Sequence, residues 1–150
     1  MRRYLIVANQ TLGTEELVQF VSTRVRKEPS EFFIVVPATP IMEMVPGAEG
    51  VPAVGGGTVL PSSPEHAHEL AQHRLETALA QLQGIGATVD GQVGHRDPVH
   101  AVEAALKGKQ FDEIVVSTLP TRISRWLRQD LPRRLEHKTQ LPVTQVSATR

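Results

Sequence analysis

The sequence predicts one α/β domain of three layers, in which an open parallel sheet of five strands lies between two layers of helices. Apolar runs rich in β-branched residues, such as 4–8 and 32–36, are typical of strands buried on both faces. Segments with apolar residues at helical spacing alternate with these runs, and strict alternation favours right-handed crossovers onto both faces of the sheet. The 150 residues suit one compact domain.

The first half of the chain contains two predicted strands and two predicted helices around a long loop. Thr14-Glu15-Glu16 is an acidic helix start, and Pro29 ends that helix. The strand 32–36 is followed by the segment 37–64, whose six prolines and five glycines exclude a long regular element. Ser62-Ser63-Pro64-Glu65 then starts a helix that Gly84 and Gly86 end.

The second half predicts three more strands and two more helices. The strand 87–93 alternates loosely and is expected near one edge of the sheet. Asp97-Pro98 starts a short helix, with the aspartate as its cap. A strand over 111–117, an apolar stripe over 123–135 and a final strand over 141–146 complete the pattern. Pro132 lies inside that stripe and is expected to kink or shorten its helix.

Charge and cysteine content exclude several classes of protein. The formal net charge is zero, so no field of the whole molecule steers it toward nucleic acid or a membrane. There is no cysteine, which excludes disulfides and a cysteine-ligated zinc site. The run 4–8 is too short for a signal sequence or a membrane span, and no other segment reaches spanning length. We therefore expect a cytoplasmic protein.

No catalytic or metal site is expected from the residue patterns. His66, Glu69 and His73 share one helix face, but exposed histidines on a helix are far commoner than a metal site. The segment 121–138 has six basic residues and two acids, which suits an anion site or a solvated helix face. Few aromatic residues are available to stack on bases, so nucleic-acid binding is not expected.

The sequence resembles the universal stress protein (UspA-like) family over about residues 3–147. The resemblance lies in the order of the elements, in the long loop after the second strand, and in Gly94-His95-Arg96-Asp97-Pro98 at the start of a helix. The strand Asp112–Ser117 and the closing segments 123–127, 133–135 and 141–143 also resemble that family. The family implies the strand order 3-2-1-4-5 of a Rossmann-like, adenine nucleotide alpha hydrolase-like fold.

Many members of that family bind ATP at the carboxyl ends of the strands, where the strand order reverses. The resemblance implies a ligand site for an adenine nucleotide at this edge. Family pairing also implies a homodimer through the fifth strand, Val143 to Val146. The expected binding residues are Ala8, Asn9, Thr11, Val36, Ser117, Thr118, Arg122, Ser124 and Arg125.

This sequence departs from the family's glycine-rich ATP motif, which makes it a divergent member. Asn9 stands where binders carry an acid, and no glycine follows the fourth strand over 117–125. Gln129-Asp130 replaces the expected Gly-Ser pair, and an aspartate repels phosphate. These departures weigh against the usual mode of ATP binding, and they favour a non-enzymatic regulatory or ligand-sensing domain.

Two alternative functions stay open at the level of sequence. The first is a nucleotide-binding protein with weak ATPase or nucleotidyl activity, in which Arg122, Arg125 and Arg128 replace the glycine loop. The second is a protein interaction module that acts through the long loop 37–64.

Overall fold

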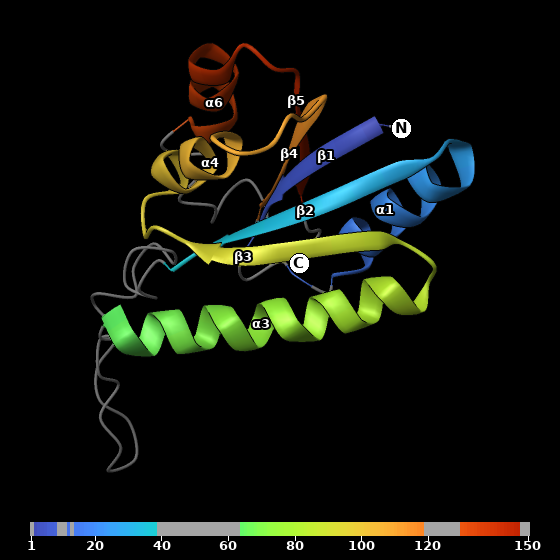
Figure 1. Cartoon of the computed structure of the whole chain (residues 1–150), viewed down its shortest axis with the longest axis horizontal. Helices are drawn as coiled ribbons and strands as arrows, with labels where there is room; N and C mark the ends of the chain where they lie inside the picture. The colour runs from blue at the N-terminus through green and yellow to red at the C-terminus, as the bar shows by residue number, and fades with distance from the viewer. Residues whose placement is uncertain (1, 9–11, 13, 39–63, 119–129, 148–150) are drawn as a thin grey trace.

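The computed structural model of the chain describes residues 2–8, 12, 14–38, 64–118 and 130–147. Strands and helices alternate along these residues, as the sequence predicts (Figure 1). In chain order the elements are β1 Arg2–Val7, α1 Glu15–Lys27, β2 Ser30–Pro37, α3 Pro64–Gly84, β3 Thr88–Gly94, α4 Pro98–Leu106, β4 Glu113–Thr118, α6 Leu131–Thr139 and β5 Val143–Ser147.

The five strands form one sheet in the order β3-β2-β1-β4-β5, and every neighbouring pair is parallel. This order confirms the predicted topology, including the place of β3 at an edge. Successive crossovers move outward from β1 to β2 and β3, and the chain then returns to the other side of β1 for β4 and β5. Right-handed crossovers in opposite directions place their helices on opposite faces.

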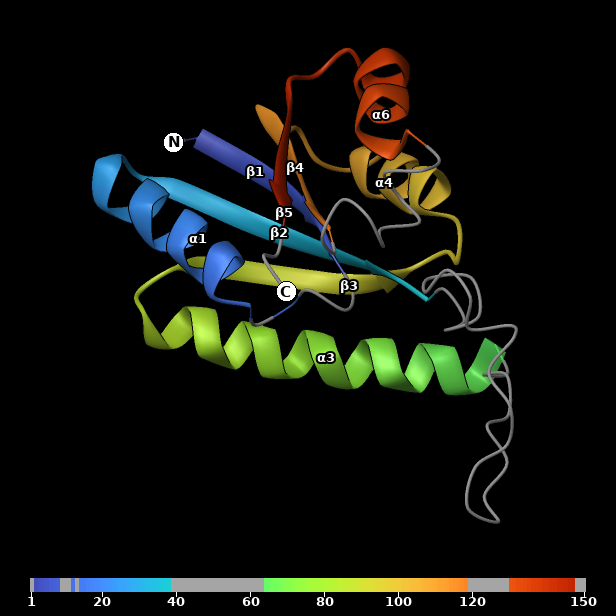
Figure 2. The same cartoon turned by 180° about the vertical axis from the view of Figure 1, so that it is seen from behind.

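Helices α1 and α3 therefore cover one face of the sheet, and α4 and α6 cover the other (Figures 1 and 2). Residues such as Ile6 and Ile34 pack with Leu17 of α1 and Leu75 of α3. Their neighbours along the strands pack in a second apolar cluster with α4 and α6. Both faces of the central strands are thus buried, which explains why their sequences are continuous apolar runs. Among the described helices, none is long and apolar enough to cross a bilayer.

The predicted start of α4 is confirmed in atomic detail. The carboxylate of Asp97 accepts a hydrogen bond from the backbone N–H of Val99 at 2.9 Å, and Pro98 lies in the first turn. Gly94 comes just before this cap, where a Cβ atom would lie 2.8 Å from the Cβ of Ala101. The glycine therefore allows α4 to pack closely against the end of β3.

The last helix begins later than the apolar stripe 123–135, in agreement with the expectation that Pro132 kinks or shortens it. The described helix α6 begins at Leu131, so Pro132 lies in its first turn instead of inside the helix. A proline is tolerated there because the first backbone N–H groups of a helix have no partner within the helix. Trp126 and the rest of the stripe before residue 130 lie outside the described residues.

Candidate functional site

The carboxyl ends of β1 and β4 form the point at which the strand order reverses. Open α/β sheets bind ligands at this edge, because neighbouring crossovers leave it in opposite directions. Val7 of β1 pairs in register with Val35 of β2 and Val116 of β4. Ala8, one residue further on, continues the ladder with a hydrogen bond from its N–H to the carbonyl of Val35 at 3.3 Å. Ala8 is therefore the last described residue that bonds to the sheet at the carboxyl end of β1.

The structure brings three predicted site residues into one row across this edge. Ala8 comes directly after β1, which lies between β2 and β4. One residue beyond the paired valines, Ala8 therefore has Val36 of β2 on one side and Ser117 of β4 on the other. Ala8 and Val36 belong to the apolar cluster that faces α1 and α3. Ser117 follows Val115 of the same cluster by two residues, so it turns to the same face. All three are buried.

Thr118 lies at the end of β4 and faces the opposite layer. Its hydroxyl is within 3.1 Å of the hydroxyl of Ser147 at the end of β5. Ser147 also accepts a hydrogen bond from the side-chain amide of Gln145 at 2.7 Å. These bonds tie the ends of the two strands together. Ser147 was not foreseen as a site residue, although it ends the strand that neighbours β4 and that position could have indicated it.

The polar atoms of this edge are engaged within the protein. In the described part of the chain, every buried side-chain nitrogen or oxygen has a hydrogen-bond partner. Thr118 and Ser117 are only 1% and 2% exposed. Their hydroxyl groups therefore lie beneath the surface at this edge and do not project into solvent. The remaining predicted site residues belong to the segments that follow β1 and β4. Asn9, Thr11, Arg122, Ser124 and Arg125 belong to these segments and lie outside the described residues.

Two helix starts near the carboxyl edges carry carboxylates. Glu15 and Glu16 lie in the first turn of α1, where they interact favourably with the helix dipole. Asp130 is the N-cap residue of α6 and adopts a left-handed conformation, with φ 57° and ψ 40°. Aspartate tolerates this region better than most side chains. Its negative charge opposes a second anion at the same helix start.

The histidine clusters do not form a site among the residues that the structure describes. The ring nitrogen Nδ1 of His95 accepts a hydrogen bond from the N–H of Asp97 at 2.9 Å, and the His95 and His100 rings are 4.8 Å apart. The first bond stabilises the turn before α4. His66, Glu69 and His73 are exposed on α3. Over the described ranges, no three metal-binding side chains come together.

Comparison with known proteins gives matches by structure and none by sequence. No family model matches the chain, and no curated protein matches it. A universal stress protein from Archaeoglobus fulgidus aligns with a TM-score of 0.61 and 15% identity, covering 97% of this chain and 93% of that one. A universal stress protein from the same organism in complex with dAMP aligns with a TM-score of 0.59 and 17% identity, covering 97% of both chains.

An Arabidopsis thaliana protein of the universal stress protein family, with AMP bound, aligns at a TM-score of 0.57 and 13% identity. The alignment covers 99% of this chain and 93% of that one. The class that the sheet order and these alignments define is an α/β domain with a parallel five-stranded sheet, whose strand order reverses between β1 and β4. More particularly, the chain has the fold of the universal stress proteins along nearly its whole length. The resemblance noted in the sequence is confirmed at the level of the fold.

Proposed function

We propose that this protein is a non-enzymatic regulatory domain that senses an adenine mononucleotide at the carboxyl ends of β1 and β4. The observation that supports this most directly is the row of Ala8, Val36 and Ser117 at the switch point of the sheet. Proteins of the same fold have been solved with dAMP and with AMP. Asn9 and Thr11 follow β1 directly, and their side chains would hydrogen-bond the base or the ribose.

A mononucleotide suits this chain better than ATP. A triphosphate needs several backbone N–H donors, and glycines usually let the backbone approach the phosphates closely. The segment 117–125 has none. Asp130 places a carboxylate at the start of α6, and that charge opposes a chain of phosphates. A single phosphate would be neutralised by arginines such as Arg122 and Arg125.

The first test is the melting temperature of the protein with AMP and with ATP at millimolar concentration. A ligand that binds only the folded state stabilises it by about 2.7 kcal/mol at a hundredfold excess over Kd, so AMP should raise the melting temperature by several degrees. ATP should raise it less. If neither AMP nor ATP raises the melting temperature, the proposal is contradicted.

Variants test which residues hold the phosphate. Arg125→Glu should abolish the AMP shift, and Arg134→Glu is its matched control because Arg134 is exposed on α6. Asp130→Asn and Asp130→Gly should both reduce the difference between the melting-temperature shift that AMP causes and the shift that ATP causes. Both remove the charge, and both accept the left-handed backbone. An AMP shift that survives Arg125→Glu would show that this arginine makes no phosphate contact.

Enzymatic activity is the main alternative and is tested on the same samples. We expect ATP incubated with the protein to break down no faster than in buffer. A turnover that disappears in Arg125→Glu and persists in Arg134→Glu would instead support a weak ATPase that uses arginines.

We also propose that the protein is cytoplasmic and works as a homodimer through β5. The absence of cysteine fits a reducing compartment. In the described part of the chain, β5 is the last strand on its side of the sheet, and its outer edge pairs with no further strand.

A further inference from the structure

The face of the sheet under α4 is only partly covered. Helix α4 has 9 residues and is therefore about 13 Å long. Strand β2 has 8 residues and spans about 26 Å. Close packing between Ala101 and Gly94 holds α4 at the carboxyl ends of the strands. On the other face, α3 runs along the whole of β3 (Figures 1 and 2). Among the helices that the structure describes, none therefore lies over the amino-terminal half of β2 and β3 on this face.

A pocket of about 420 Å³ occupies this uncovered half, within the size range of small-molecule sites. We call it the amino-end pocket. It lies at the end of the sheet opposite the switch point. The strands β1, β2 and β3 and the connection after α4 line it, with Arg3, Glu31, Phe32, Phe33, Thr88, Val89, Asp90, Lys109, Gln110 and Phe111.

Two aromatic rings and one ammonium group form the centre of the pocket. The rings of Phe33 and Phe111 have their centroids 6.2 Å apart, at an angle of 46°. The Nζ atom of Lys109 lies 3.8 Å from the centroid of Phe33. At an exposed site, an ammonium group gains less from lying over an aromatic ring than from donating a hydrogen bond to a charged group.

Two cationic and two anionic side chains surround the rings, and one cation and one anion form an ion pair with each other. Arg3 and Glu31 face each other in register and form an ion pair at 3.4 Å, with both side chains around half exposed. Within the described residues, neither Lys109 nor Asp90 has an ion-pair partner. Asp90 is in register with Phe33. Its carboxylate accepts a hydrogen bond from the N–H of Gly91 at 2.8 Å. One cation and one anion therefore remain beside an aromatic floor.

We propose that the amino-end pocket binds a free α-amino acid with an aromatic side chain. The ligand's carboxylate would pair with Lys109, its ammonium group with Asp90, and its ring with Phe33 and Phe111. Lys109 has a flexible stem, so its ammonium group can leave the ring of Phe33 for the ligand's carboxylate at a net gain in free energy. A ligand with only one charge would leave either Lys109 or Asp90 without a partner, so the pocket favours a zwitterion.

The test compares three small molecules that share a phenyl ring. L-Phenylalanine carries both charges, 3-phenylpropionate lacks the ammonium group, and phenethylamine lacks the carboxylate. In titration calorimetry we expect L-phenylalanine to bind at least about tenfold more tightly than either analogue, because each lost pair is worth about 1.4 kcal/mol or more. Equal binding of an analogue, or no binding of L-phenylalanine, would overturn the proposal.

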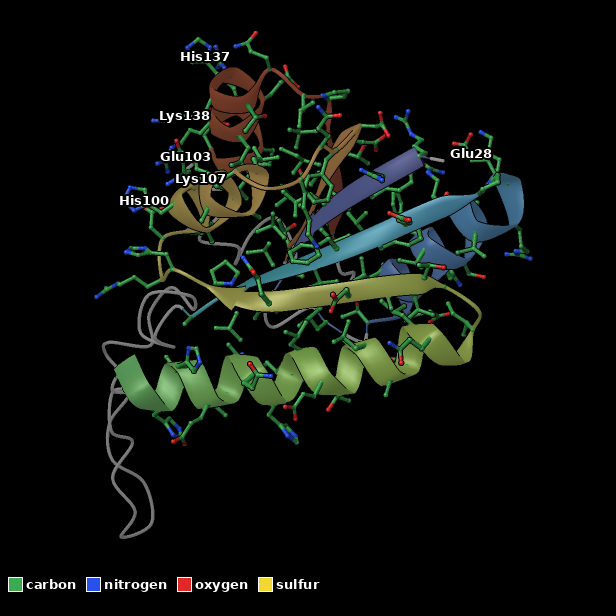
Figure 3. All side chains as sticks on the ribbon, viewed as in Figure 1. Glu28, His100, Glu103, Lys107, His137 and Lys138 are labelled. Carbon is green, nitrogen blue, oxygen red and sulfur yellow. The ribbon has the colours of Figure 1, made fainter. Side chains whose placement is uncertain are left out.

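Variants and controls locate the binding site. Lys109→Met and Asp90→Asn should each weaken L-phenylalanine about tenfold or more. Lys107→Met and Glu28→Gln change the same charges outside the pocket lining and should leave the affinity unchanged (both residues are labelled in Figure 3). The Asp90→Asn side chain keeps an oxygen that can accept from the N–H of Gly91, so folding should be preserved. Amide NMR shifts should cluster at residues 31–33, 88–90 and 109–111, and shifts clustered at residues 8 and 117–118 would refute this location.

Discussion

Gly91 of β3 shows how one residue can be fixed by packing. A Cβ atom at this position would lie 2.6 Å from the carbonyl oxygen of Ile34 and 2.7 Å from a methyl group of Leu75. The first contact is with backbone, which cannot rotate away as a side chain can. The glycine therefore allows α3 and β2 to approach β3 closely.

We expect Gly91→Ala to lower the free energy of unfolding by about 1–3 kcal/mol, the usual cost of overpacking. Gly84→Ala is the matched control. It lies in the last turn of α3 with nothing within 4 Å of its Cβ position, and alanine favours the helix. Chemical denaturation measures both variants. If Gly91→Ala leaves the free energy of unfolding unchanged, the strands β2 and β3 can separate slightly without loss of stability.

Glu113 is a buried carboxylate that joins three strands at the amino end of the sheet. It is 8% exposed. One oxygen accepts from the guanidinium of Arg2 at 2.7 Å, and the other accepts from the hydroxyl of Thr144. The hydrogen bond from Arg2 to Glu113 raises the pKa of Arg2 above its ordinary value. A guanidinium is protonated at any accessible pH, so this hydrogen bond joins two charged groups whenever Glu113 is ionised.

Replacing Glu113 by glutamine should cost about 1–3 kcal/mol of unfolding free energy, because one partner of the buried hydrogen bonds becomes a donor. Glu31→Gln provides the comparison. Its pair with Arg3 at 3.4 Å is about half exposed, so its loss should cost less than about 1 kcal/mol. If denaturant titrations show that Glu113→Gln and Glu31→Gln lower the free energy of unfolding equally, the buried carboxylate of Glu113 contributes no more than the half-exposed one of Glu31.

At the scale of elements, β5 has one edge that its partner strand does not use. The N–H of Ile114 donates to the carbonyl of Pro142 at 2.9 Å, and Ile114 is in register with Val143. In a parallel ladder this places the backbone groups of Thr144 and Val146 toward β4. The backbone groups of Val143 and Gln145 consequently point to the outer edge of the sheet.

If the protein forms the homodimer that we propose, Gln145→Pro should convert it to a monomer at little cost in stability. Proline removes an N–H that faces outward and leaves the ladder with β4 intact. Gln145→Val keeps that N–H and should remain dimeric. Light scattering after gel filtration measures the mass of each variant. A proline variant that is still dimeric would show that the subunits associate through another surface.

The elements themselves could largely be predicted from local sequence. Asp97-Pro98 was predicted to start a helix and does so, because a cap involves only neighbouring residues. The start of α6 was less well predicted, since the apolar stripe around Pro132 does not reveal on which side of the proline the helix begins. The uncovered sheet under α4 was not predicted at all. It depends on comparing the length of a helix with the length of strands that are distant in the sequence.

For the whole molecule, the two proposed sites lie at opposite ends of the same parallel sheet. The switch-point edge contains Ala8 and Ser117, and the amino-end pocket contains Asp90 and Lys109. About 26 Å of β2 separates these ends. The two tests are therefore independent, since the probes, variants and NMR signals of one site do not involve the other. Failure of one proposal would leave the other standing.

The sequence by itself determined the alternation of elements and the three-layer class, because hydrophobic periodicity and caps act within short segments. The resemblance to the universal stress protein family indicated Ala8, Val36, Ser117 and Thr118 as residues of one edge, because it implied the strand order and a site at the carboxyl ends of the strands. Only the tertiary structure decided that Thr118 bonds Ser147 and that Lys109 lies over Phe33. Those contacts join residues 29 and 76 positions apart. The first follows from the register of β4 and β5, and the second depends on how the connection after α4 packs against β2.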